Sequence, residues 1–256
     1  MSETPKDRRE MSLGEKFSAP EVAPPPWSLF SAAITVFAML VALISVGPAL
    51  ASIFLGGEAI SHFLLMLSWC FGMTFAIVFV LASRRSSDGM WSALCLRRGH
   101  LPLPFALLIG VAIALSVQLF VSLASSKFYA IPELFDFWEV EPKNIVSAAL
   151  LLILLQPVAE SLVFHAIALP SLRWNLGPWI GVLLTSVLFT LLHLSVFSAA
   201  NRALYINPWY DNVYPFLTCL AFSMLKVYSG SSSAVIIGRM GAGLVFFLTG
   251  LAVAGA

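Results

Sequence analysis

Residues 145–170, which read IVSAALLLILLQPVAESLVFHAIALP, decide the class of fold. The stretch is almost continuously apolar and exceeds the roughly 20 residues that an α-helix needs to cross about 30 Å of hydrocarbon. Its apolar residues do not alternate with polar ones, which excludes a strand of a membrane β-barrel. Residues 145–170 therefore predict a transmembrane helix, and the buried Glu160 within it needs a reason to be there.

The same apolar character extends over most of the chain. Hydrophobic residues make up 59% of the 256 positions and charged residues 11%, whereas a soluble domain has about 45–50% and about 25%. We therefore predict an all-α, polytopic membrane protein with about seven transmembrane helices and the lipid bilayer as its main partner. The net charge of +1 gives no electrostatic case for nucleic acid. The predicted spans are 28–54, 63–82, 103–123, 145–170, 179–198, 213–229 and 231–254.

Three regions follow from this pattern. Residues 1–26 are polar, end in three prolines and predict a disordered tail. Residues 27–144 hold three spans and an outer interfacial loop, and residues 145–254 hold the remaining spans.

The distribution of Lys and Arg predicts the orientation, because cytoplasmic loops carry an excess of basic residues. With seven spans, most of the 14 basic residues lie on the side of the N-terminal tail. The N-terminus is thus predicted to be cytoplasmic and the C-terminus outside. The outer loop 124–144 interleaves aromatic and acidic residues, which fits either an aromatic belt at the headgroups or a docking surface for a partner.

Four ionisable residues fall inside predicted spans: Glu160, His165, His193 and Arg239. Charges in the membrane are costly and by default mark a function or a mutual pair. Counted from the cytoplasmic side at 1.5 Å per residue, Glu160 lies at a depth of about 15 Å, His193 about 21 Å and Arg239 about 12 Å. These three can meet if their helices pack together. His165 lies about 140° around a regular helix from Glu160 and need not join them.

Pro157 stands one turn before Glu160. A proline inside a helix removes a hydrogen-bond donor and usually kinks the helix. In a membrane such a break persists where neighbours or water satisfy the freed groups. A kink beside a buried carboxylate predicts a polar cavity.

The residues around Glu160 resemble the first motif of the CPBP family, the CAAX-processing and bacteriocin-processing intramembrane proteases, also called Abi proteins. That motif is a Glu pair, three residues and Arg, with Pro upstream and Phe before the Arg. Pro157, Glu160 and Phe164 match it, whereas Ser161 replaces the second Glu and His165 replaces the Arg.

The second motif of the family, Phe-three-residues-His, is intact as Phe189-Thr-Leu-Leu-His193. The third, His-three-residues-Asn, is altered: Arg239 stands at the His position and Gly243 at the Asn position. The resemblance thus implies a CPBP-like helical core in the C-terminal half, degenerate in the first and third motifs.

By this resemblance, Glu160 and His193 are the catalytic candidates, as a general-base pair that activates water. Ser161, His165, Phe189 and Arg239 are possible accessory residues. The oxyanion donors of the third motif are absent, which predicts a severe loss of activity. Three roles for Arg239 stay open: an ion pair with Glu160, a cationic oxyanion stabiliser, or no contact with the site.

A zinc site formed by Glu160 and His193, with or without His165, is a further reading. The chain has no His-Glu-x-x-His motif, and Arg239 would oppose a cation. We therefore expect neither a metal nor a cofactor.

Three functions remain open from the sequence. The first is a catalytically degenerate CPBP-like protein that binds or scaffolds a membrane protein partner or a transmembrane segment, in a bacterial plasma membrane by family resemblance. The second is an active glutamic-type intramembrane endopeptidase using Glu160 and His193. The third is a small structural subunit or transporter.

Overall fold

The structure of the protein is a computed structural model, which describes residues 11–21, 24–55, 62–85, 89–96, 99, 101–126, 142–198 and 208–254. Over these residues the secondary structure is helical, without a strand. The expected outer loop 124–144, with its acidic and aromatic residues, lies outside the described residues between 127 and 141.

The N-terminal part begins with a short helix, α1 (Leu13–Ser18). A bent helix follows, formed by α2 (Leu29–Val41), the π-helical turn η1 (Ala42–Val46) and α3 (Gly47–Leu55). The remaining helices of this part are α4 (His62–Arg84), α5 (Met90–Ala93) and α6 (Leu103–Ser125).

The C-terminal part is built around one long helix, formed in turn by α7 (Pro142–Ala149), η3 (Leu150–Leu155), α8 (Gln156–Glu160), η4 (Ser161–Ala168) and α9 (Leu169–Leu176). The segments η3 and η4 have the wider turns of a π-helix, a form that often marks functional sites. The last elements are α10 (Pro178–His193), η5 (Leu194–Ser198), η6 (Trp209–Val213), α11 (Tyr214–Ser229) and α12 (Ser232–Ala254).

The prediction of an all-α, polytopic membrane protein is confirmed. Within the described residues, six helices are long and apolar enough to cross a membrane: Leu29–Phe54, Phe63–Arg84, Leu103–Ser125, Pro142–Leu176, Pro178–Val196 and Ser232–Ala252. The predicted span 213–229 is a helix, but it is not among the six. With 16 residues, including Lys226, α11 is shorter and more polar than the others.

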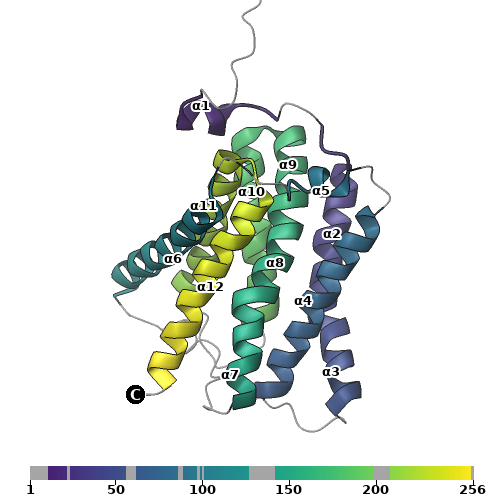
Figure 1. Ribbon diagram of the computed structural model, residues 1–256, viewed down its shortest axis with the longest axis vertical. Helices are drawn as coiled ribbons and strands as arrows, with labels where there is room; N and C mark the ends of the chain where they lie inside the picture. The colour runs from purple at the N-terminus through teal and green to yellow at the C-terminus, as the bar shows by residue number, and fades with distance from the viewer. Residues whose placement is uncertain are drawn as a thin grey trace, which may run out of the picture.

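The α11 helix nevertheless packs within the bundle, against α10, α12 and α6. At its C-terminal end, Tyr228 lies under the ammonium group of Lys16 from α1, at 5.0 Å. Just before its N-terminal end, the hydroxyl of Tyr210 lies 3.1 Å from that of Ser122 near the far end of α6. In Figure 1, α1 lies at one end of the bundle and the C-terminal end of α12 lies at the other.

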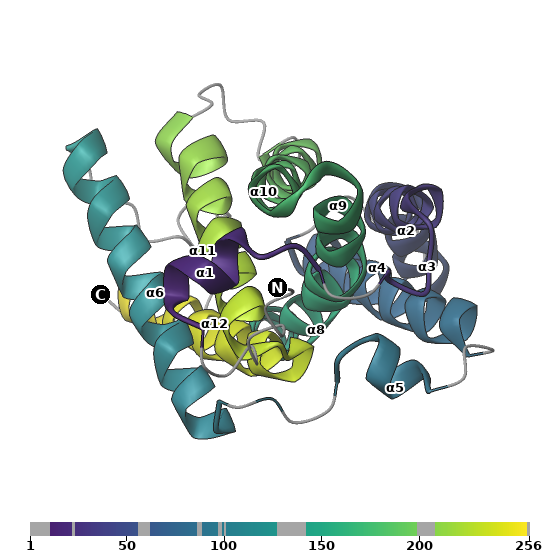
Figure 2. The same ribbon diagram turned by 90° about the horizontal axis from the view of Figure 1, so that it is seen from above.

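The long helix Pro142–Leu176 occupies the middle of the bundle. It packs against α2 and α4 on one side and against α10 and α12 on the other. In the view from above, α8 and α9 lie between the α2–α4 group and the group of α6, α11 and α12 (Figure 2). Every residue from 159 to 169 is consequently buried. Glu160 is thus held where lipid does not reach it.

The N-terminal tail differs from its prediction. Residues 1–26 were expected to be disordered, but residues 13–18 form α1. The Ser12 hydroxyl accepts from the Glu15 amide, and the Glu15 carboxylate accepts from the Ser12 amide, which completes a capping box. The helix also lies against α10 and α11. Composition alone missed these local and tertiary contacts.

Close approach of two helices attaches α6 to the core. A Cβ built on Gly110 would overlap the carbonyl oxygen of Gly238 in α12. Small residues at such crossings let membrane helices pack closely, where burial from water supplies no driving force.

We predict that Gly110→Ala lowers the free energy of unfolding by about 1–3 kcal/mol, the usual effect of overpacking. Thermal unfolding of the purified protein in detergent measures this change. Gly14→Ala in α1 is the control, because its new Cβ meets nothing within 4 Å. Equal melting temperatures for the two variants would contradict the close-packing account.

Candidate functional site

The site is centred on Glu160, the last residue of α8. Pro157 lies in the first turn of α8, and the π-helical segments η3 and η4 flank this short helix. The backbone is therefore irregular around Glu160, as the proline predicted. The Glu160 side chain is 0% exposed, so its carboxylate depends on protein partners for hydrogen bonds.

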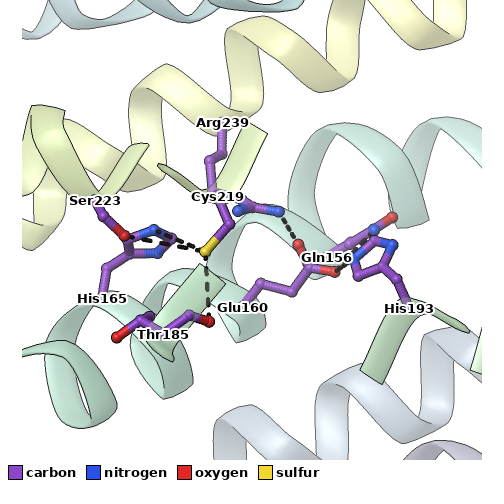
Figure 3. A network of polar contacts seen from close by, with 8 residues as sticks. All are labelled: Gln156, Glu160, His165, Thr185, His193, Cys219, Ser223 and Arg239. Carbon is purple, nitrogen blue, oxygen red and sulfur yellow. Dashed lines mark hydrogen bonds and ion pairs between the residues drawn. The ribbon is translucent and has the colours of Figure 1, made fainter. Parts of the chain in front are cut away.

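Three side chains supply those partners (Figure 3). The Gln156 amide donates to Oε1 of Glu160 at 2.9 Å. The same oxygen lies 3.1 Å from Nε2 of His193. The guanidinium of Arg239 forms an ion pair with Oε2 through Nη2. The predicted convergence of Glu160, His193 and Arg239 is confirmed, although their catalytic roles stay a prediction.

Aromatic rings hold the Arg239 guanidinium in place. Its central carbon lies 4.8 Å from the ring centre of Phe189 and 5.4 Å from that of Phe222. Such cation–π contacts are strengthened where water is excluded. Nη1 of Arg239 is buried and has no hydrogen-bond partner within the described residues.

Phe189 joins several parts of the site. Its ring packs edge-to-face on Phe164 at 5.1 Å and lies 4.3 Å from the His193 ring, centre to centre. The ring of Phe189 thus contacts the His193 imidazole and the Arg239 guanidinium, and it packs in turn on Phe164. Phe189 therefore positions its neighbours.

His165 belongs to a different cluster. Its Nε2 lies 3.9 Å from Sγ of Cys219 in α11, and the same thiol lies 3.9 Å from the Thr185 carbonyl oxygen and 4.0 Å from the Ser223 hydroxyl. Figure 3 shows this group beside the Glu160 site. The sequence-based expectation that His165 need not join Glu160 is confirmed. Ser161 is also buried, and its hydroxyl has no partner among the described side chains and backbone.

Of the residues considered for zinc, Glu160 and His193 lie together, whereas His165 lies beside Cys219. Within the described part of the chain, no group of three or more His, Cys, Asp or Glu side chains is arranged to hold a metal ion.

Gly243, where the motif resemblance implies an Asn, has no room for a side chain. A Cβ built on Gly243 would overlap the carbonyl oxygen of Leu152 in η3. The backbone of α12 thus occupies the space where an amide side chain would begin.

Sequence reasoning missed Gln156 and Phe222. Gln156 precedes Glu160 by four residues, a spacing that places two side chains on one helical face, so its contact was detectable. Phe222 comes from the sixth predicted span, and nothing in its local sequence indicates a contact with Arg239.

His193 lies at the partly exposed side of the cluster around Glu160. Its side chain is 20% exposed, whereas the Glu160 side chain is fully covered. Any group that reaches the carboxylate from this side must pass the imidazole first.

We predict that replacing one partner of the Glu160–Arg239 ion pair lowers the free energy of unfolding more than replacing both partners. Loss of one partner from a buried pair costs about 3–5 kcal/mol, because the other charge remains uncompensated. Glu160→Gln and Arg239→Met should each lower the melting temperature in detergent. The double variant should recover a large part of the loss.

Arg85→Met is the matched control, because Arg85 is exposed at the end of α4. Additive effects of Glu160→Gln and Arg239→Met in the double variant would contradict the pairing.

Comparison with known proteins bears on the same part of the chain. No curated protein and no solved structure matches it. Residues 142–245 match the family model described as Rce1-like, type II CAAX prenyl endopeptidase Rce1-like. The match contains Glu160, His193 and Arg239 and agrees with the resemblance drawn from the motifs. Residues 142–245 are therefore similar to the Rce1-like family of type II CAAX prenyl endopeptidases.

Proposed function

We propose that the protein is a non-proteolytic, Rce1-like membrane protein that binds or scaffolds a membrane protein partner through its transmembrane bundle. The observation that carries this proposal is the ion pair between Arg239 and Glu160. We place the protein in a plasma membrane with the α1 end cytoplasmic, a placement supported by the basic residues at that end.

The ion pair bears directly on general-base chemistry. A general base must accept a proton from water through a free lone pair within hydrogen-bond reach. Oε2 of Glu160 is engaged by Arg239, and Oε1 by Gln156 and His193. Protein groups therefore engage both oxygens and take three of the about four acceptor positions of the carboxylate, which leaves at most one for a nucleophilic water.

The altered third motif points in the same direction. By the family resemblance, positions 239 and 243 should supply donors to the oxyanion. Arg239 is committed to Glu160, and at position 243 the backbone of α12 lies against Leu152. Loss of one oxyanion donor reduces kcat about 10²–10³-fold, so loss of both favours a protein without useful turnover.

One observation favours a second candidate, an active glutamic-type endopeptidase. The Glu160–His193 contact of 3.1 Å is retained, and Nη1 of Arg239 is buried without a partner among the described residues. A guanidinium with one free N–H could face an oxyanion while its other nitrogen holds Glu160. In this alternative Arg239 replaces the missing donors.

A cleavage assay separates the two candidates. The full-length protein in proteoliposomes is incubated with a prenylated CAAX peptide and with a membrane-anchored protein that carries one transmembrane segment. We expect no cleavage above that of the Glu160→Gln/Arg239→Met variant, which keeps the site electrically neutral.

The binding half of the proposal is measured on the same samples. A membrane partner should co-purify in stoichiometric amount with both the wild type and the double variant. Cleavage by the wild type that disappears in a folded His193→Ala variant would instead establish the endopeptidase.

A further inference from the structure

A second buried arginine lies outside the Glu160 site. Arg173, near the end of α9, has a side chain only 1% exposed. Its Nε donates to Oε1 of Glu21 at 2.7 Å, and its Nη2 donates to the carbonyl oxygen of Ala19 at 2.9 Å. Nη1 donates to the carbonyl oxygens of Pro178 at 3.1 Å and Phe17 at 3.5 Å.

These contacts show what Arg173 binds. Three of its four acceptors belong to residues 17–21 of the N-terminal segment. Two of them are carbonyl oxygens at the C-terminal end of α1, where a helix leaves unpaired acceptors, and the third is a carboxylate. A guanidinium fork is suited to this combination of ligands. A buried arginine is destabilising unless paired, so residues 17–21 complete the fold at this end.

Aromatic residues extend the same surface. The Trp179 ring lies 6.2 Å from the Phe17 ring, and its Nε1 donates to the Ser18 hydroxyl at 3.3 Å. Lys16 lies over the Tyr228 ring at 5.0 Å. Figure 2 shows α1 lying across this end of the bundle above α11. The surface formed by Arg173, Trp179 and Tyr228 is called the strap site below.

A second cation lies near the same carboxylate. The buried ammonium of Lys226 donates to the Ser232 hydroxyl at 3.0 Å and interacts electrostatically with Glu21. Glu21 therefore lies in the field of two buried cations, one from α9 and one from α11. The charge of this end favours an acidic ligand.

The strap site and its ligand come from different parts of the chain. The strap site and the nearby Lys226 lie within the region matched by the Rce1-like family model, residues 142–245. Residues 12–21 lie outside that region. The ligand is also weakly folded by itself, because an isolated helix of six residues is marginal in water. Its order depends on the strap site.

We propose that residues 12–21 are a displaceable strap, and that the strap site also accepts a partner's helix C-terminus followed by a carboxylate. The tether to α2 is short, which gives the strap an effective concentration of about mM against a competing ligand. The strap therefore limits access of a partner to this end of the bundle. The inference is independent of whether Glu160 is catalytic.

A peptide of residues 11–21, labelled with a fluorophore, tests the proposal against the full-length protein in nanodiscs. In one chain the strap is weakened by Phe17→Ala and Glu21→Ala, which change no residue of the strap site. We expect fluorescence anisotropy to show at least tenfold tighter binding of the peptide to this chain than to the wild type. A peptide carrying Glu21→Gln should bind the weakened chain at least tenfold more weakly.

Two receptor variants make the result specific. Adding Arg173→Met to the weakened chain should abolish binding of the peptide. If that variant does not fold, Trp179→Ala replaces it and should likewise abolish binding. Trp174→Ala, at an exposed residue of α9, should leave binding unchanged. Equal binding of the peptide to the wild type and the weakened chain, or no binding to either, would overturn the proposal.

Discussion

The need to neutralise a carboxylate inside the membrane shapes the centre of this protein. Glu160 is fully covered, and its compensation comes from an arginine on a helix 79 positions away in the sequence. To bring the two together, α12 must pack against the long helix Pro142–Leu176, and α11 must supply Phe222 beside the guanidinium. The glycines of α12 permit that approach, at Gly243 against Leu152 of η3 and at Gly238 against Phe222 of α11. Electrostatics and steric fit thus require the same arrangement of helices.

Arg239, which stands where the motif resemblance implies a His, has two consequences that belong together. The guanidinium supplies the positive charge that a buried carboxylate requires, and it also occupies one of the oxygens that chemistry would use. Gly243 has a similar effect. Where the motif resemblance implies a hydrogen-bond donor, the backbone of α12 instead contacts Leu152 of η3. Under the proposed function the centre serves as a structural core, in which the His193 ring packs on that of Phe189.

Sequence reasoning succeeded where a strong physical constraint left a local pattern. Long apolar runs predicted the helices, and the cost of intramembrane charge predicted that Glu160, His193 and Arg239 converge. It failed where long-range contacts decide. The capping box of Ser12 and Glu15 was legible in the sequence, but the order of the tail also depends on Arg173, which is 154 positions from Ala19. The wider turns of η4 and the placement of Phe222 are likewise results of packing.

The central claim is that Glu160 is an ionised carboxylate held by Arg239 inside the bundle. Infrared difference spectroscopy of the protein in nanodiscs, comparing the wild type with Glu160→Gln, measures this state directly. The account predicts that the substitution removes carboxylate stretching bands and that the wild type shows no band of a protonated carboxylic acid from this residue. A protonated acid band that vanishes with Glu160→Gln would mean that the charge pair does not exist.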